Sequence, residues 1–124
     1  MKKQAIIVED CLIQSTVLKK ILENEGFEIS GIYSSGPEAI EGGIQHKPSI
    51  LLIDIFLKGN LNGFEVARKV RELYDVPVIF ITAVNDKDQC IQNHNFEKSI
   101  LLNKPVSRTD LLDSIHFLLN PVHA

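Results

Sequence analysis

Charged residues follow short apolar runs at three places in this chain. Glu9 and Asp10 come directly after AIIV, Asp54 follows ILLI, and Lys104 comes soon after ILL. If these runs are buried strands of one parallel sheet, their carboxyl ends meet at one edge and the charged groups share a cleft. Packing does not explain such residues, because an unpaired buried charge is strongly unfavourable. A magnesium site built for phosphoryl chemistry does explain them.

Short apolar runs alternate with amphipathic segments along the whole chain, which is typical of βα units. The pattern predicts five strands, at residues 5–9, 27–33, 49–54, 78–81 and 99–102. It predicts helices in the segments 13–25, 37–47, 64–73, 85–97 and 107–120. Because crossovers between parallel strands are right-handed, these elements predict a flavodoxin-like, doubly wound α/β sheet in the order 2-1-3-4-5 with helices on both faces.

The same pattern gives local expectations about which residues are buried. The first helix is expected to bury one apolar stripe, formed by Ile13, Val17, Leu18, Ile21 and Leu22. The second strand is expected at an edge of the sheet with four residues on one face: Phe27, Ile29, Gly31 and Tyr33. Gly42 and Gly43 each cost about 1 kcal/mol inside a helix, so the second helix is expected to be short or mobile.

Composition limits the class of protein. The 124 residues are enough for one domain, residues 1–124, with a real core. The net charge of −3 and the absence of a basic stripe argue against direct nucleic-acid binding, so we expect a protein partner. No apolar stretch approaches about 20 residues and no signal peptide is visible, which predicts a cytoplasmic protein without a membrane segment. Neither the two cysteines nor the four histidines have zinc-ligand spacing.

The charged residues also match a known motif series. The chain resembles, over essentially its whole length, the receiver domain of response regulators in two-component signalling. Receivers carry an acidic pair after the first strand, a phosphorylated aspartate after the third, a threonine or serine after the fourth, and a lysine-proline after the fifth. At the family's usual spacing, the matching residues here are Glu9-Asp10, Asp54, Thr82 and Lys104-Pro105.

The resemblance implies a phosphoacceptor rather than an enzyme. Asp54 would take a phosphoryl group from the phosphohistidine of a histidine kinase or histidine phosphotransfer protein. Phosphorylation would then switch the conformation and signal to a downstream protein or an output domain. The implied partner surface is formed by the fourth helix, the fifth strand and the last helix.

The resemblance also assigns a role to each site residue. Mg²⁺ would be held by Glu9, Asp10, Asp54 and the backbone carbonyl of Phe56. Asp10 and Asp54 would be direct ligands, and Glu9 would act through water. Lys104 and Thr82 would each hold an oxygen of the phosphoryl group. The Lys104-Pro105 bond is expected to be cis.

Some positions depart from the usual receiver pattern. Leu101 stands where many receivers have the aromatic residue that couples the site to the output face. The loop IFLKGNLN lacks a common proline and is a residue longer before Gly63, which predicts a mobile rim. Phe56 and Val84 flank the expected path of a hydrolytic water. Because neither side chain can orient water, we expect a long-lived phosphoryl group.

Two other functions remain open. A magnesium-dependent aspartyl phosphohydrolase would use Asp54 in a similar way, but it needs a second acid at the position of Phe56. A flavodoxin-like binding module that has lost phosphorylation would keep the same fold, although no glycine-rich phosphate loop or aromatic pair for a flavin is visible. Taken singly, the Glu9-Asp10 pair is better explained as a helix N-terminal cap. The four motifs together favour the receiver.

Overall fold

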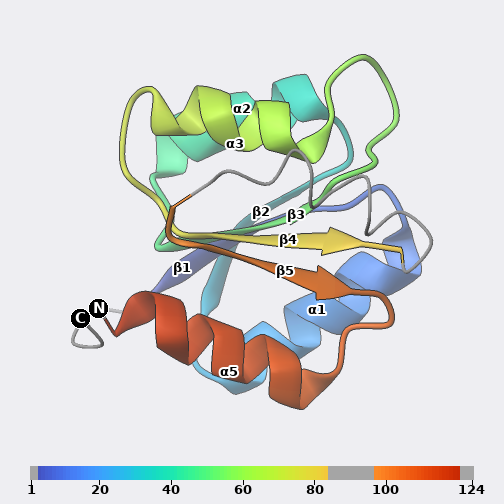
Figure 1. The fold of residues 1–124 in the computed structure, drawn as a ribbon, viewed down its shortest axis with the longest axis vertical. Helices are drawn as coiled ribbons and strands as arrows, with labels where there is room; N and C mark the ends of the chain where they lie inside the picture. The colour runs from blue at the N-terminus through green and yellow to red at the C-terminus, as the bar shows by residue number, and fades with distance from the viewer. Residues whose placement is uncertain (1–2, 84–96, 121–124) are drawn as a thin grey trace.

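A five-stranded parallel sheet forms the centre of the protein (Figure 1). The computed structural model describes residues 3–83 and 97–120. The strands are β1 (Gln4–Val8), β2 (Glu28–Tyr33), β3 (Ile50–Asp54), β4 (Val78–Thr82) and β5 (Ser99–Asn103). The described helices are α1 (Leu12–Asn24), α2 (Gly36–His46), α3 (Gly63–Arg71) and α5 (Arg108–Leu119). All but the last residue of the segment predicted as the fourth helix lies outside the described residues.

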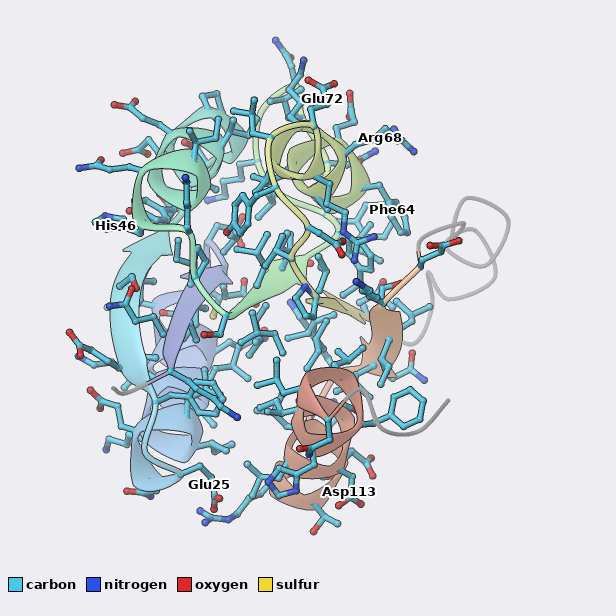
Figure 2. The ribbon with its side chains drawn as sticks, turned by 90° about the vertical axis from the view of Figure 1, so that its left-hand side faces the viewer. Glu25, His46, Phe64, Arg68, Glu72 and Asp113 are labelled. Atoms are coloured by element: carbon cyan, nitrogen blue, oxygen red, sulfur yellow. The ribbon has the colours of Figure 1, made fainter. Side chains whose placement is uncertain are left out.

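The order of the strands is β2-β1-β3-β4-β5, which confirms the flavodoxin-like, doubly wound prediction. Helices α2 and α3 cover one face of the sheet, and α1 and α5 cover the other (Figures 1 and 2). Strand β3 is buried on both faces: Leu51 and Ile53 pack toward α2 and α3, whereas Ile50 and Leu52 pack toward α1 and α5. Burying a side chain of this size contributes about 1.5–3 kcal/mol, so the strand is held firmly up to Asp54.

The predicted stripe of α1 is only partly buried. Leu18 and Leu22 pack against the sheet, but Ile13 is 76% exposed and Val17 is 49% exposed. Ile13 and Leu22 are nine positions apart, which places them on opposite sides of a helix at about 100° per residue. A stripe of that width cannot face the sheet throughout, so the expectation that Ile13 and Val17 are core residues was wrong.

Strand β2 lies at the edge, as predicted, but its side chains do not share one face. Ala5 of β1 pairs with Ile29, and the next residue, Ile6, pairs with Gly31, so the register shifts past Ser30. This irregularity turns the strand: Phe27 and Ile29 pack on the side of α1 and α5, whereas Tyr33 packs on the side of α2 and α3.

Helix α2 is longer than its two central glycines suggested. A Cβ atom at Gly42 would lie 2.3 Å from the Oη and Cζ atoms of Tyr33, and one at Gly43 would lie 3.0 Å from Val70. The missing side chains let β2 and α3 pack closely on α2, and this packing offsets the low helix propensity of glycine. None of the helices within residues 3–83 and 97–120 is long and apolar enough to cross a membrane.

Candidate functional site

The predicted site residues lie together at the carboxyl edge of the sheet. Glu9 follows β1, Asp54 ends β3, Thr82 ends β4, and Lys104 follows β5. Glu9 and Asp54 are only 3% and 5% exposed, and Thr82 is completely buried. Oxygen atoms of Glu9, Asp10 and Asp54 all lie within 4.8 Å of one another. The topology therefore builds one acidic pocket from residues that are far apart in the sequence.

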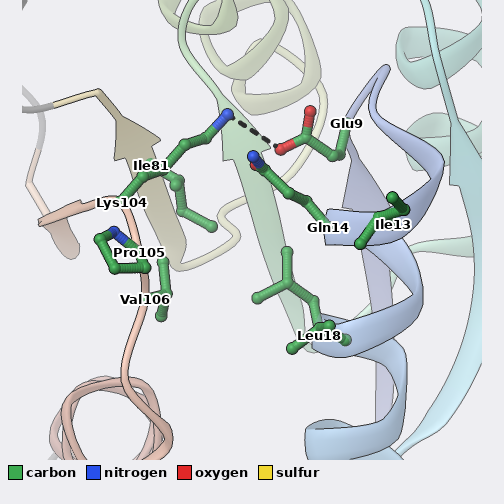
Figure 3. A pocket seen from close by; sticks show the side chains of 9 residues that line it. Glu9, Ile13, Gln14, Leu18, Ile81, Lys104, Pro105 and Val106 are labelled. Carbon is green, nitrogen blue, oxygen red and sulfur yellow. Dashed lines mark ion pairs between the residues drawn. The ribbon is translucent and has the colours of Figure 1, made fainter.

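Lys104 pairs with two of the acids. Its Nζ atom lies 2.8 Å from Oδ2 of Asp54. The same atom lies 3.2 Å from Oε1 of Glu9, and Figure 3 shows this second ion pair. Burial alone would lower the pKa of Lys104, but the hydrogen bond to Asp54 and the charges of Asp54 and Glu9 outweigh it and raise that pKa. The Lys104 backbone N–H donates to the carbonyl of Thr82 at 2.8 Å, and the Lys104-Pro105 bond is cis, as the resemblance implied.

Backbone amides hold the two buried carboxylates in place. The N–H of Phe56 donates to Oδ1 of Asp54 at 3.1 Å, which leaves Oδ2 for the ammonium group. The N–H of Cys11 donates to Oε2 of Glu9 at 3.1 Å, and the N–H of Glu9 itself donates to the carbonyl of Tyr33 at 2.9 Å. Each acid is therefore fixed by the turn that immediately follows its strand.

The pocket carries more negative than positive charge. Burial raises the pKa of Glu9 to about 7 against the opposing hydrogen bond from Cys11, and the charge of Asp54 raises it further, while Lys104 lowers it. Within the described structure, Oε1 of Glu9 accepts no hydrogen bond, although it is buried and close to Lys104. An oxygen-only set of ligands with surplus negative charge and a buried oxygen lacking a hydrogen-bond donor suits a hard divalent cation such as Mg²⁺.

An apolar groove of about 170 Å³, which we call the α1 groove, borders the acidic pocket (Figure 3). Glu9 and Lys104 line both the groove and the pocket. The apolar residues lining the α1 groove are Ile13, Val17, Leu18, Ile81, Pro105 and Val106. This groove could not be predicted from the sequence, because Ile13 and Val17 belong to the apolar stripe of the first helix and their apolar character alone gives no sign that they are exposed.

Comparison with known proteins settles the family. A family profile described as the response regulator receiver domain matches residues 5–116. The chain belongs to this family. The receiver domain of the PhyR response regulator from Erythrobacter litoralis is 27% identical, with a TM-score of 0.85, and the match covers 95% of this chain and 90% of that one. The receiver domain of a modulated diguanylate cyclase from Desulfovibrio desulfuricans G20 is 30% identical, with a TM-score of 0.81 and coverage of 96% and 94%.

A longer protein also contains a similar receiver domain. The anti-anti-sigma factor PhyR from Bartonella quintana is 27% identical, with a TM-score of 0.81. The match covers 96% of this receiver domain but only 48% of that protein, so this chain spans about half of its length. Receivers act in two-component signalling together with kinase or phosphotransfer partners and output partners.

The loop after β3 in this receiver is anchored by backbone and side-chain contacts at two points. Ser35 and Lys58 form an isolated parallel bridge between the loops that follow β2 and β3. At the end of the loop, Asn62 caps α3 in a capping box: its side chain accepts from the Glu65 N–H, and the Glu65 side chain accepts from the Asn62 N–H, each at 3.0 Å. These contacts connect the loop expected to be a mobile rim to two neighbouring elements.

The position of the usual aromatic switch is occupied differently here. Leu101 in β5 is partly buried and packs against the core formed with α2 and α3.

Thr82, two strand positions from Phe80 on β4, donates from its hydroxyl to the carbonyl of Ala83 at 3.4 Å. Val84, the other residue expected to flank the path of a hydrolytic water, lies outside the described residues.

Proposed function

We propose that this chain acts as a single phosphoacceptor receiver domain, which takes a phosphoryl group from a phosphohistidine onto Asp54. The observation that carries the proposal is the environment of the Asp54 carboxylate. It is buried, one oxygen is held by a backbone amide, and the other faces the ammonium group of Lys104 beside two further acids. A nucleophilic carboxylate needs this combination of a fixed position and nearby positive charge to approach an anionic donor.

The transfer itself exchanges one bond to phosphorus for another. A bond forms between a carboxylate oxygen of Asp54 and phosphorus, while the bond from phosphorus to the imidazole nitrogen of the donor breaks. The imidazole leaves with the electron pair and takes up a proton from solvent. Lys104, which is now paired with Asp54, would instead form an ion pair with a phosphoryl oxygen. Thr82 would donate a hydrogen bond from its hydroxyl group to another phosphoryl oxygen.

Glu9, Asp10, Asp54 and the backbone carbonyl of Phe56 would hold Mg²⁺ in this receiver. When bound, the cation would neutralise part of the negative charge on the phosphoryl group. The oxygen-only ligand set and the buried Oε1 of Glu9 support this assignment. Once formed, the acyl phosphate would be lost slowly, because the apolar Phe56 side chain cannot position a water for attack. The domain would therefore act as a signal carrier, not as a phosphatase.

The donor would be a histidine kinase or a histidine phosphotransfer protein that covers the α1 groove. Leu12 and Ile13 are exposed at the start of α1, next to the acidic pair, and large apolar side chains in such a position favour contact with a partner. The output would pass to a downstream protein or a joined domain. The anti-anti-sigma factor among the similar structures indicates one kind of protein output that a receiver of this type can serve.

Intact-mass spectrometry tests the proposed phosphotransfer. Incubation of the purified protein with acetyl phosphate and Mg²⁺ is expected to give a single phosphoryl adduct, which peptide mapping places on Asp54. A sample treated with a chelator should give little or none, because three acids would repel the donor. The adduct should persist for hours at neutral pH. A folded protein that gains no adduct at any Mg²⁺ concentration would instead be a binding module that has lost phosphorylation.

The Ile13→Ser substitution separates donor docking from the chemistry. We expect it to slow transfer from a phosphorylated histidine phosphotransfer protein about tenfold, because burial of an isoleucine side chain by a partner is worth about 1.5 kcal/mol or more. Phosphorylation by acetyl phosphate should stay within about twofold. The donor is chosen as the fastest of a purified panel acting on the unmodified receiver, and transfer is followed by loss of radiolabel from the donor.

Leu73→Ser provides the matched control for donor docking. Leu73 lies within the segment predicted as the third helix, but it follows α3 and is 65% exposed. Helix α3 covers the face of the sheet opposite to α1 and its groove (Figure 1). Its replacement removes a similar apolar surface and should leave the rate of phosphorylation by both donors unchanged. If Ile13→Ser slows phosphorylation by both donors equally, or does not slow phosphorylation by the protein donor, the α1 groove is not the binding site of the protein donor.

A further inference from the structure

The start of α3 is in direct contact with the backbone that carries Asp54. The N–H of Gly63 donates to the carbonyl of Ile55 at 2.8 Å. A Cβ atom at Gly63 would lie 2.7 Å from the carbonyl oxygen of Asp54, 2.8 Å from Cγ2 of Ile53 and 2.9 Å from Cα of Ile55. Real Cβ atoms essentially never show contacts this short. No side chain larger than hydrogen therefore fits here without a shift.

Space, not conformation, requires glycine at position 63. Among the described glycines, only Gly26 and Gly59 adopt a positive φ, so the backbone of Gly63 is one that other residues can adopt. Two of the three obstructing atoms are backbone atoms, from the last residue of β3 and the residue after it, and the third belongs to a fully buried isoleucine. An added methyl group would therefore press on the peptide of the phosphoacceptor itself.

Helix α3 cannot easily move away to make room. The capping box of Asn62 and Glu65 fixes where the helix begins. Phe64 is buried directly after Gly63, and its ring centroid lies 4.7 Å from that of Phe80 in β4. The rest of the helix is anchored by further buried residues, Val66, Ala67 and Val70. Because closely packed interiors transmit strain, a clash at Gly63 is expected to displace Asp54 and Ile55 rather than the helix.

We propose that Gly63 is a positioning residue for the phosphoacceptor: its missing side chain seats the N-terminus of α3 on the Asp54 peptide and so sets the position of the carboxylate. The inference rests on the proposed function of Asp54. The carboxylate is held on one side by the Phe56 amide and on the other by Lys104, so a displacement of its backbone disturbs both contacts. A misplacement of about 1 Å can cost on the order of a hundredfold in rate.

Gly63→Ala tests the proposal, with Gly43→Ala as the matched control. Both substitutions add one methyl group to the same core, but the methyl at Gly43 meets the Val70 side chain, away from the acidic pocket. With acetyl phosphate at saturating Mg²⁺, we expect the maximal rate of phosphorylation to fall at least about tenfold in Gly63→Ala, with little change in the half-saturating acetyl phosphate concentration. Gly43→Ala should stay within about twofold at the same temperature, well below either melting point.

A second readout does not depend on phosphorylation. The amide proton of Phe56 reports its hydrogen bond to Asp54 in an NMR spectrum, and it should move in Gly63→Ala but not in Gly43→Ala. An unchanged Phe56 resonance together with an unchanged rate would overturn the proposal. If the unmodified protein gains no phosphoryl group, the proposed function fails, and the Phe56 resonance alone then decides whether Gly63 positions Asp54.

A milder variant covers the case in which Gly63→Ala does not fold. Asn62→Ala removes the cap and loosens the start of α3 without adding a clash, whereas Asn62→Asp keeps an oxygen acceptor for the Glu65 N–H. We expect Asn62→Ala to shift the Phe56 resonance and slow phosphorylation several-fold, and Asn62→Asp to restore both. If Asn62→Ala lowers only the melting temperature, the start of α3 is merely structural and the proposal is wrong.

Discussion

Replacing Asp54 with asparagine is expected to abolish the phosphoryl adduct and to stabilise the protein when divalent cations are absent. Three carboxylates face one ammonium group in the pocket, so the metal-free protein carries surplus buried negative charge. Asparagine removes one charge and still accepts the Phe56 N–H through its carbonyl oxygen, while Lys104 keeps Glu9 as its charged partner. We expect a gain on the order of 1 kcal/mol in the free energy of unfolding, or about 4 °C in melting temperature.

Urea unfolding in the presence of a chelator, monitored by circular dichroism, measures this gain. Mass spectrometry after incubation with acetyl phosphate measures the loss of the adduct. Asp113→Asn on the exposed side of α5 is the matched control, because it removes the same charge outside the pocket and should change neither result. Addition of Mg²⁺ should stabilise the unmodified protein more than Asp54→Asn, since one ligand is missing. A phosphoryl adduct on Asp54→Asn would show that another residue is the acceptor.

The position of the site could be predicted from the sequence because strands buried on both faces are unambiguous. The runs before Glu9 and Asp54 are apolar throughout, so the first charged residue marks the point where each strand leaves the core. Parallel strands bring these points to one edge, and the order of strands then places Glu9 next to Asp54. The arrangement of the pocket thus follows from local patterns and one topological rule.

Features that depend on contacts between distant segments could not be predicted. The apolar residues of α1 span half of its circumference, and only the position of the sheet decides that Leu18 is buried and Ile13 exposed. Gly63 looked like the end of a loop, because nothing in its neighbours indicates that the Asp54 carbonyl lies against it. The register shift of β2 at Ser30 likewise arises from its pairing with β1, and the alternating sequence pattern gives no sign of this shift.

The same distant contacts connect the pocket to the rest of the molecule. Glu9 and Lys104 line both the pocket and the α1 groove, so the proposed donor, by filling the groove, would touch the residues that face Asp54. On the opposite face of the sheet, the start of α3 lies against the Asp54 carbonyl at Gly63. Asp54 therefore lies between the helix that is proposed to contact the donor and the helix that is proposed to set its backbone. In the proposed function, donor binding and phosphoryl transfer would be coupled through these shared residues over short distances.

Replacing Lys104 with methionine should have the opposite effect on stability to Asp54→Asn. Methionine keeps most of the apolar stem but removes the ammonium group 2.8 Å from Asp54 and 3.2 Å from Glu9. Two buried carboxylates then lose their partner, and breaking a buried ion pair in this way costs about 3 kcal/mol or more. In a chelator we expect the melting temperature to fall by about 10 °C, and Mg²⁺ should restore more stability to this variant than to the unmodified protein.

Phosphorylation of Lys104→Met by acetyl phosphate should be about a hundredfold slower even at saturating Mg²⁺, because the ammonium group can no longer stabilise a phosphoryl oxygen during transfer. Lys98→Met is the matched control: Lys98 pairs with Asp75 on the surface, where such a pair contributes about 1 kcal/mol or less. That variant should be phosphorylated at the normal rate. A Lys104→Met protein that is as stable as the unmodified one in chelator would show that the three acids do not depend on Lys104 for charge compensation. The charge balance argued for the pocket would then be wrong.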